Sequence, residues 1–202
     1  KNFFKEKGYR NENIYILPNP LTKNDKHDIE KEQYILYAGR ISNEKGIEEL
    51  IGAFKKRDNR NLALKIIGNG PLLSELKDKY EDKSIYFLGE ISNPEVIKHI
   101  SKSQAVVSAT KLFEGQPTLL CEASYLKVNS IFPKTGGIQE FLPVDYEYLF
   151  EQFDYDDLLN KINLLSNKNI SRKSSENVYN YIKEYLSTEL QQKRYREVFD
   201  EK

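Results

Sequence analysis

The sequence predicts an α/β protein in which a Rossmann-like, doubly wound parallel sheet is covered by helices on both faces. Short apolar runs alternate along the chain with longer segments whose apolar residues recur at helical spacing. The apolar runs are nearly continuous, which is typical of parallel strands buried on both faces. Repeated strand–helix units of this kind favour a doubly wound sheet, and 202 residues suffice for one such domain.

Each element follows from its own segment of sequence. The β-prone apolar runs predict strands over residues 34–39, 62–68, 84–89, 104–109, 129–133 and 146–150. Helical spacing predicts helices over residues 46–56, 71–80, 93–103, 117–126, 155–166, 176–186 and 187–202. In the first of these helices Leu50, Ile51 and Phe54 would share one face. In the third, Asn93 is predicted to be the N-cap, with Pro94 at the first helical position.

The chain is predicted to form a single domain over residues 1–202. Residues 34–166 would form the Rossmann-like core and residues 171–202 the closing helices. The opening residues, 1–22, do not fit the alternation; their "IYILPNP" predicts a short strand and a proline-broken linker. The chain starts at Lys1 and contains no methionine, so we expect it to be part of a longer protein.

Composition excludes several classes of function. Lys and Arg number 31 and Asp and Glu number 31, so the chain lacks the basic excess of a nucleic-acid-binding protein. No apolar run approaches the roughly 18 residues that a membrane span needs. The single cysteine, Cys121, cannot form an intrachain disulfide and is expected to be a buried thiol. These features favour a cytoplasmic location.

The residues that follow each predicted strand are the candidates for a binding site, because ligands of such sheets bind at the carboxyl ends of the strands. After the first strand, "GRISNEKG" places Gly39, Arg40 and Lys45 before a helix N-terminus, a combination suited to a diphosphate. A solvated turn with a Glu44–Lys45 charge pair is the simpler alternative. Glycine-rich turns, "GNGP" and "PKTGG", follow the second and fifth strands.

The stretch "LFEGQPTLLCEAS" carries two acids around a predicted helix start. Glu114 lies in the loop after the fourth strand, and Pro117 suits the first turn of the helix. Glu122, within that helix, can accept hydrogen bonds from the two vicinal hydroxyls of a ribose. Free N–H groups over residues 116–118 can face a phosphate. Either acid alone is more often an ordinary surface residue; together they describe a site for a nucleotide sugar.

These motifs, in this order, resemble the group 1 glycosyl transferases, a family of retaining enzymes with the GT-B fold. The resemblance rests on "GRISNEKG", "GNGP", "IYFLG", the pair Glu114 and Glu122, and "TGGIQEFL", and it covers roughly residues 34–142. It implies that this chain is the C-terminal, donor-binding domain. It also implies sugar transfer with retention, a nucleotide diphosphate sugar as donor, and no metal or other cofactor.

The resemblance also implies roles for individual residues. Arg40 and Lys45 would hold the diphosphate and Glu114 the donor sugar, and these three would be the catalytic residues. Glu122 would bind the ribose, and Ile91 would lie near the base. The implied donor-binding positions are Gly39, Gly68, Ile91, Gly115, Gln116, Pro117, Thr118, Glu122, Gly136 and Gly137.

The sequence departs from the family pattern, roughly E-G-F-G-L-P-x-x-E, at several positions. Gln116 and Pro117 replace Phe and Gly, and Leu119 replaces the later Pro. Lys127 and Asn129 occupy positions that are commonly Gly and Pro. Both acids remain, so the departures bear on the loop conformation and on the identity of the donor sugar.

Two other functions fit parts of the pattern. A glycoside hydrolase could use Glu114 and Glu122 as its pair of carboxyl groups, but it has no phosphate for Arg40 and Lys45 to hold. A non-catalytic nucleotide-sugar-binding partner is the other alternative. The "DYD" at residues 154–156 imitates a metal-binding motif, but it stands at a helix start, where Asp caps, and we expect no metal there.

The resemblance implies a partner domain as well. The acceptor, a glycan or a lipid-linked molecule, would be bound by a missing N-terminal domain, and that half would make any peripheral contact with the inner face of the membrane. Assembly of cell-envelope polysaccharide is the implied setting. Tyr195, Val198 and Phe199 of the closing helix would face the missing domain, so some of them should be exposed or repacked here.

Overall fold

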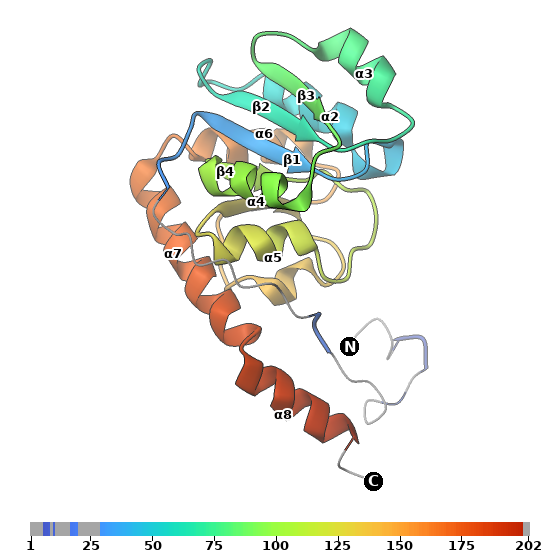
Figure 1. Ribbon diagram of the computed structural model, residues 1–202, viewed down its shortest axis with the longest axis vertical. Helices are drawn as coiled ribbons and strands as arrows, with labels where there is room; N and C mark the ends of the chain where they lie inside the picture. Colours follow the sequence, from blue (N-terminus) through green and yellow to red (C-terminus); the bar gives the residue numbers. More distant parts are fainter. Residues whose placement is uncertain (1–5, 9, 11–16, 20–28, 200–202) are drawn as a thin grey trace.

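The computed structural model describes residues 6–8, 10, 17–19 and 29–199, and over these residues a six-stranded parallel sheet is flanked by helices (Figure 1). The strands are β1 (Tyr34–Ala38), β2 (Ala63–Ile67), β3 (Ile85–Gly89), β4 (Ala105–Val107), β5 (Asn129–Pro133) and β6 (Leu149–Phe150). Their order is β3-β2-β1-β4-β5-β6, and every neighbouring pair is parallel. The predicted fold class is therefore confirmed. The order reverses between β1 and β4, which is where such sheets open a ligand crevice.

Helices cover both faces of the sheet. They are α2 (Ile47–Lys55), α3 (Leu73–Tyr80), α4 (Asn93–Lys102), α5 (Thr118–Tyr125), α6 (Tyr155–Leu164), α7 (Lys168–Tyr185) and α8 (Thr188–Phe199), with the 3₁₀ turns η2 (Asn43–Lys45) and η3 (Ile138–Phe141). Helices α4 and α5 lie in front of the sheet in Figure 1, whereas α2 and α6 lie behind it and pack on each other. Helix α7 runs along α5 and continues toward α8.

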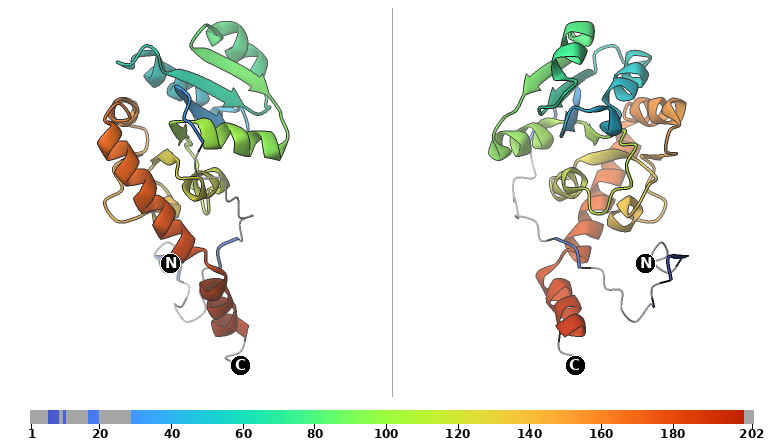
Figure 2. Two further views of the ribbon diagram at one scale, coloured as in Figure 1. Left: turned by 60° about the vertical axis from the view of Figure 1, so that its left-hand side comes forward. Right: turned by 90° about the vertical axis from the view of Figure 1, so that its right-hand side faces the viewer.

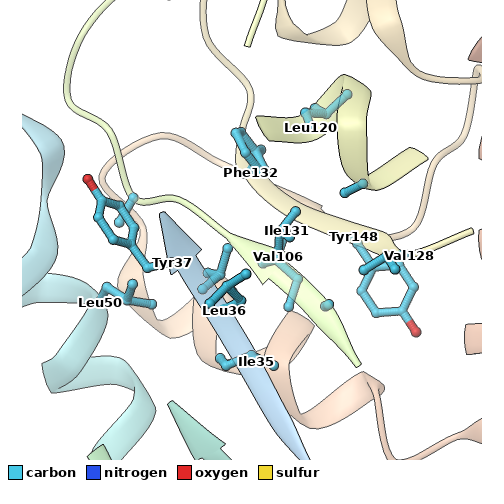
Figure 3. Packing of buried hydrophobic residues seen from close by; sticks show 14 of the residues in the cluster. Ile35, Leu36, Tyr37, Leu50, Val106, Leu120, Val128, Ile131, Phe132 and Tyr148 are labelled. Carbon is cyan, nitrogen blue, oxygen red and sulfur yellow. The ribbon is translucent and has the colours of Figure 1, made fainter. Parts of the chain in front are cut away.

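The core lies at the centre of the sheet, where the strands are apolar on both faces. Leu36 of β1 is paired with Val106 of β4, and Val107 with Ile131 of β5. All four side chains are buried, and Figure 3 shows how the residues of β1, β4 and β5 gather between the helices. Burial on both faces explains why these strands read as continuous apolar runs.

The structure corrects three predicted helix starts. The N-cap of α4 is Ser92 rather than Asn93, and Ser92 forms a capping box with Glu95. Pro117 is itself the N-cap of α5 and not part of its first turn. Helix α7 begins at Lys168, well before the predicted start at residue 176, because the side chain of Asn167 accepts a hydrogen bond from the N–H of Ile170 and starts the helix there.

The predicted strand over residues 146–150 is shorter in the structure. Only Leu149 and Phe150 pair with β5. Tyr146 is buried instead through its side chain, whose hydroxyl accepts a hydrogen bond from the N–H of Ser130 at 2.7 Å. The short strand predicted within "IYILPNP" falls mostly on residues outside the described part of the chain.

Two departures from the family pattern have structural explanations. Lys127 adopts a left-handed conformation, φ 53°, at a position where the family commonly has glycine. Its ammonium group pairs with Glu176 of α7 at 3.2 Å, which offsets some of the backbone cost. The side-chain amide of Asn129 donates to the main-chain oxygen of Ser171 at 2.8 Å. Both residues therefore tie the end of α5 and the start of β5 to α7.

Helix α8 leaves part of its apolar face uncovered. Figure 2 shows it at the end of α7, standing away from the sheet. Tyr195 and Phe199 are 44% and 68% exposed, and their rings stack at 6.3 Å between centroids. The expectation of exposed residues on this helix is thus confirmed. Among the described helices none is both long enough and apolar enough to cross a bilayer.

Candidate functional site

The loops that follow β1 and β2 meet backbone to backbone at the carboxyl edge of the sheet. Gly68 has φ 135°, and a Cβ atom there would stand 1.9 Å from the main-chain oxygen of Gly39. The Gly39 N–H in turn donates to the oxygen of Ile67 at 3.0 Å. Glycine at position 68 is therefore required by the contact between these two loops.

The turn that carries Lys45 is pressed against the end of β4. Gly46 closes η2 with φ 66°, and a Cβ atom there would lie 2.0 Å from the main-chain oxygen of Ala109. No other residue fits this approach without displacing one of the two backbones. Arg40 precedes the turn with an exposed side chain, and its main-chain oxygen accepts a hydrogen bond from the hydroxyl of Tyr37 at 2.7 Å.

Lys45 and Glu114 are brought into direct contact. The Lys45 Nζ atom lies 2.6 Å from Oε1 of Glu114, and each side chain is about a quarter exposed, 27% and 26%. The hydroxyl of Thr110 donates to the same carboxylate oxygen at 3.1 Å. The ion pair and the hydrogen bond from Thr110 together hold the Glu114 carboxylate in one orientation at the carboxyl edge of the sheet. The simpler Glu44–Lys45 pairing is not what this lysine forms.

The loop after β5 supports Glu114 from the other side. The N–H of Gly137 donates to the main-chain oxygen of Glu114 at 2.8 Å. Gly136 has φ 58°, and a Cβ atom there would lie 2.0 Å from that same oxygen. The segment after "PKTGG" forms the short 3₁₀ turn η3. Loops after β1, β2, β4 and β5 therefore form one continuous surface along the carboxyl ends of the strands.

The side chain of Gln116 forms hydrogen bonds to the main chain of Asn19. Its side-chain oxygen accepts from the N–H of Asn19 at 2.6 Å, and its side-chain nitrogen donates to the main-chain oxygen of Asn19 at 3.1 Å. The same nitrogen lies 3.9 Å from the sulfur of Cys121. Burial raises the pKa of the Cys121 thiol to about 12, so this cysteine is protonated and inert at neutral pH, as expected of a buried thiol.

Glu122 lies in α5, one turn beyond the helix start. Its side chain is half-buried, and burial raises the pKa of its carboxyl group above the ordinary value. Within the described part of the chain its carboxylate makes no hydrogen bond or ion pair. Thr118, at the first position of α5, is exposed, as is Gly115 before it. Ile91, in the loop after β3, packs partly against the core.

Sequence reasoning missed two residues of this site. Thr110 bonds Glu114, and Lys111 pairs with Glu49 of α2 at 2.6 Å. Both directly follow the predicted fourth strand, so their position was the available signal. Asp154, by contrast, has the predicted capping role, since its carboxylate accepts from the N–H groups of Asp156 and Asp157.

The chain is similar to known proteins in both sequence and fold. The family model "Glycosyl transferases group 1" matches residues 21–185. The capsular polysaccharide biosynthesis glycosyltransferase CapM of Staphylococcus aureus is 27% identical over 161 residues, covering 76% of this chain and 42% of CapM. The chain therefore spans less than half the length of this relative.

Solved structures show the same fold. S. aureus TarM, crystallised with fondaparinux, α-GlcNAc-glycerol and UDP, superposes with a TM-score of 0.82 at 22% identity, covering 98% of this chain and 42% of TarM. The C-terminal domain of the group 1 glycosyl transferase LpcC of Francisella tularensis superposes with a TM-score of 0.65 at 26% identity. That match covers 77% of this chain and 87% of the LpcC domain. The architecture is the Rossmann-like half of a GT-B fold.

Proposed function

Because this chain belongs to the group 1 glycosyl transferases, we propose that it is the donor-binding domain of a retaining glycosyltransferase that uses a nucleotide diphosphate sugar. The observation that carries the proposal is the ion pair of Lys45 and Glu114, 2.6 Å apart. It joins a cation before one helix to an acid before another, where the order of the strands reverses. In such a pair the cation would suit the diphosphate of a nucleotide sugar, and the adjacent acid would suit the hydroxyl groups of its sugar.

Each residue of the site would have a distinct task. Arg40 and Lys45 would hold the diphosphate, and the main chain of residues 115–118 would contact phosphate and sugar at the start of α5. Glu114 would accept hydrogen bonds from sugar hydroxyls, and Glu122 from the ribose. As the glycosidic bond breaks, negative charge grows on the departing phosphate, and preorganised cations stabilise it. We expect donor binding to need no divalent metal.

The partners of the domain are part of the same proposal. UDP accompanies TarM in its crystal, and a domain of LpcC similar to this chain is C-terminal in its protein, which supports a nucleotide sugar as ligand and a C-terminal place for this domain. The acceptor, a glycan or a lipid-linked molecule, would be bound by a second domain. The name of CapM, a capsular polysaccharide biosynthesis glycosyltransferase, supports cell-envelope polysaccharide assembly as the setting. The domain would act in the cytoplasm, at the inner face of the membrane.

The roles of the two acids can be separated by calorimetry with UDP, GDP, UDP-GlcNAc and GDP-mannose. Glu122→Ala is expected to weaken both free nucleotides and nucleotide sugars, because the ribose is common to both. Glu114→Ala should weaken only the sugar-bearing compounds. Glu75→Ala, which removes an exposed acid from the first turn of α3, is the control and should change neither. Equal losses of free nucleotide in both acid variants would contradict the assigned roles.

Glu122 is expected to favour nucleotide binding, but its burial predicts that it lowers the stability of the folded protein. Its pKa is raised in the folded state, so the folded protein binds the proton more tightly, and stability from this group is lost as pH rises through the folded pKa. At neutral pH the charged carboxylate therefore opposes folding. Glu122→Gln should raise the free energy of unfolding at pH 7 while weakening nucleotide binding.

Urea unfolding of both proteins at pH 7 and pH 4 measures this effect. The advantage of Glu122→Gln should shrink at the lower pH, where the native carboxyl group becomes protonated. A variant that is less stable than the wild type at pH 7 would show that the carboxylate has a structural partner in the folded protein.

A further inference from the structure

Lys111 connects the loop after β4 to the turn after β1 through both its main chain and its side chain. Its N–H donates to the main-chain oxygen of Glu44 at 2.9 Å. Its Nζ atom donates to Oδ1 of Asn43 at 2.9 Å and lies 2.6 Å from Oε1 of Glu49. One residue therefore binds both η2 and the first turn of α2.

The ion pair of Lys111 and Glu49 is sheltered from solvent. The two side chains are 26% and 28% exposed. The second carboxylate oxygen of Glu49 is buried and has no hydrogen-bond partner among the described residues. A half-buried carboxylate in this position depends on the neighbouring ammonium group, because an unpaired buried charge is costly.

The ion pair of Lys111 and Glu49 and that of Lys45 and Glu114 connect the same two segments in opposite directions. Lys45 of η2 reaches the acid of the loop after β4, while Lys111 of that loop reaches an acid that follows η2. Between the two ion pairs, Gly46 packs directly on the main chain of Ala109. The two loops are thus joined at three places, and Lys111 supplies one of them.

We propose that Lys111 is a positioning residue that clamps the loop bearing Glu114 against the turn bearing Lys45. This inference rests on the proposed function, since the clamp would set the spacing between the diphosphate site and the sugar site. The loop holds exposed Leu112 and Gly115 between Lys111 and α5, and a chain of this kind is easily displaced. Groups that bind one ligand together must keep their relative positions within about 0.5 Å.

The first test needs no donor. Hydrogen–deuterium exchange is measured on the wild type, Lys111→Met and Lys111→Arg. The methionine variant keeps most of the side-chain stem and loses the charge, and it should increase exchange of the amides in residues 43–46 and 109–116 about tenfold. The arginine variant should restore most of the protection.

Lys79→Met is the matched control. Lys79 pairs with Glu48 at 2.8 Å, so the control removes an ion pair from the neighbouring acid of the same helix, but one that leads to α3. It should leave exchange in both loops unchanged. Unchanged loop exchange in Lys111→Met, or an equal increase in Lys79→Met, would overturn the clamp.

The second test separates positioning from general stability. For each protein the affinity of a nucleotide sugar is divided by that of its free nucleotide, with UDP-GlcNAc and UDP or GDP-mannose and GDP as probes. Lys111→Met should lower this ratio about tenfold, because the sugar site moves relative to the diphosphate site, and Lys111→Arg should recover it. An unchanged ratio would refute the positioning role. If the wild type bound none of these probes, the proposed function would fail, while the exchange comparison would still decide whether Lys111 fixes the loop.

Discussion

Lys45→Met is expected to weaken binding of a nucleoside diphosphate by roughly 2–5 kcal/mol, the usual cost of removing one partner of a desolvated charge pair. Two effects add in this variant. The phosphate loses a cation, and the carboxylate of Glu114, now without its ion pair, repels the diphosphate. Arg40→Ala should also weaken binding, but by less, because the Arg40 side chain is exposed and leaves no neighbouring acid unpaired.

Calorimetry on single and double variants checks this prediction. The Glu114 carboxylate is expected to repel the diphosphate only when Lys45 is absent. The double variant Lys45→Met/Glu114→Gln should therefore bind free nucleotide more tightly than Lys45→Met alone. Such non-additivity is characteristic of groups in direct contact. Lys79→Met, which breaks an ion pair elsewhere, should not change the affinity. Full additivity of the two substitutions would show that the ion pair seen in the free protein is unrelated to the donor.

Gly136→Ala is expected to destabilise the folded protein by roughly 2–5 kcal/mol. The left-handed conformation, φ 58°, costs a residue with a Cβ atom about 1–2 kcal/mol. Displacing the main-chain oxygen of Glu114, which would lie 2.0 Å from the new Cβ atom, adds about 1–3 kcal/mol of overpacking. Donor binding should suffer as well, because the displaced oxygen belongs to the residue that pairs with Lys45.

Gly115→Ala is the matched control in the adjoining loop. A Cβ atom at Gly115 would meet nothing within 4 Å, so the free energy of unfolding should change by less than about 1 kcal/mol. Denaturant unfolding of the two variants measures the difference. Equal stability of Gly136→Ala and the wild type would mean that the loops after β4 and β5 are not packed as described.

The parallel sheet, and the edge at which the residues after its strands gather, could be predicted from sequence for a definite physical reason. Strands buried on both faces carry continuous apolar runs, and the residues that follow them must lie at one edge of the sheet. That reasoning identified Lys45 and Glu114 separately. It could not show that they pair with each other, because the register that places η2 beside the loop after β4 depends on the packing of β1 against β4.

The polar parts of the structure were harder to predict. Helix α7 begins within a segment of few apolar residues, and its start depends on the Asn167 cap and on the hydrogen bond between Asn129 and Ser171. In the sequence, only its position after the fourth strand distinguishes Lys111 from the other lysines. Its partners, Asn43 and Glu49, are distant in sequence and meet it only through the fold. The glycines could be recognised from sequence as special positions. The backbone that each glycine approaches is determined by the packing of the loops and could not be predicted.

The most direct measurement is a crystal structure of this chain soaked with the nucleotide sugar that raises its melting temperature most in the panel of UDP and GDP compounds. We expect one bound molecule at the carboxyl edge of β1 and β4, with the diphosphate against Arg40 and Lys45, the ribose against Glu122 and the sugar against Glu114. Density for the compound at the opposite edge of the sheet, or a diphosphate that contacts neither Arg40 nor Lys45, would contradict it.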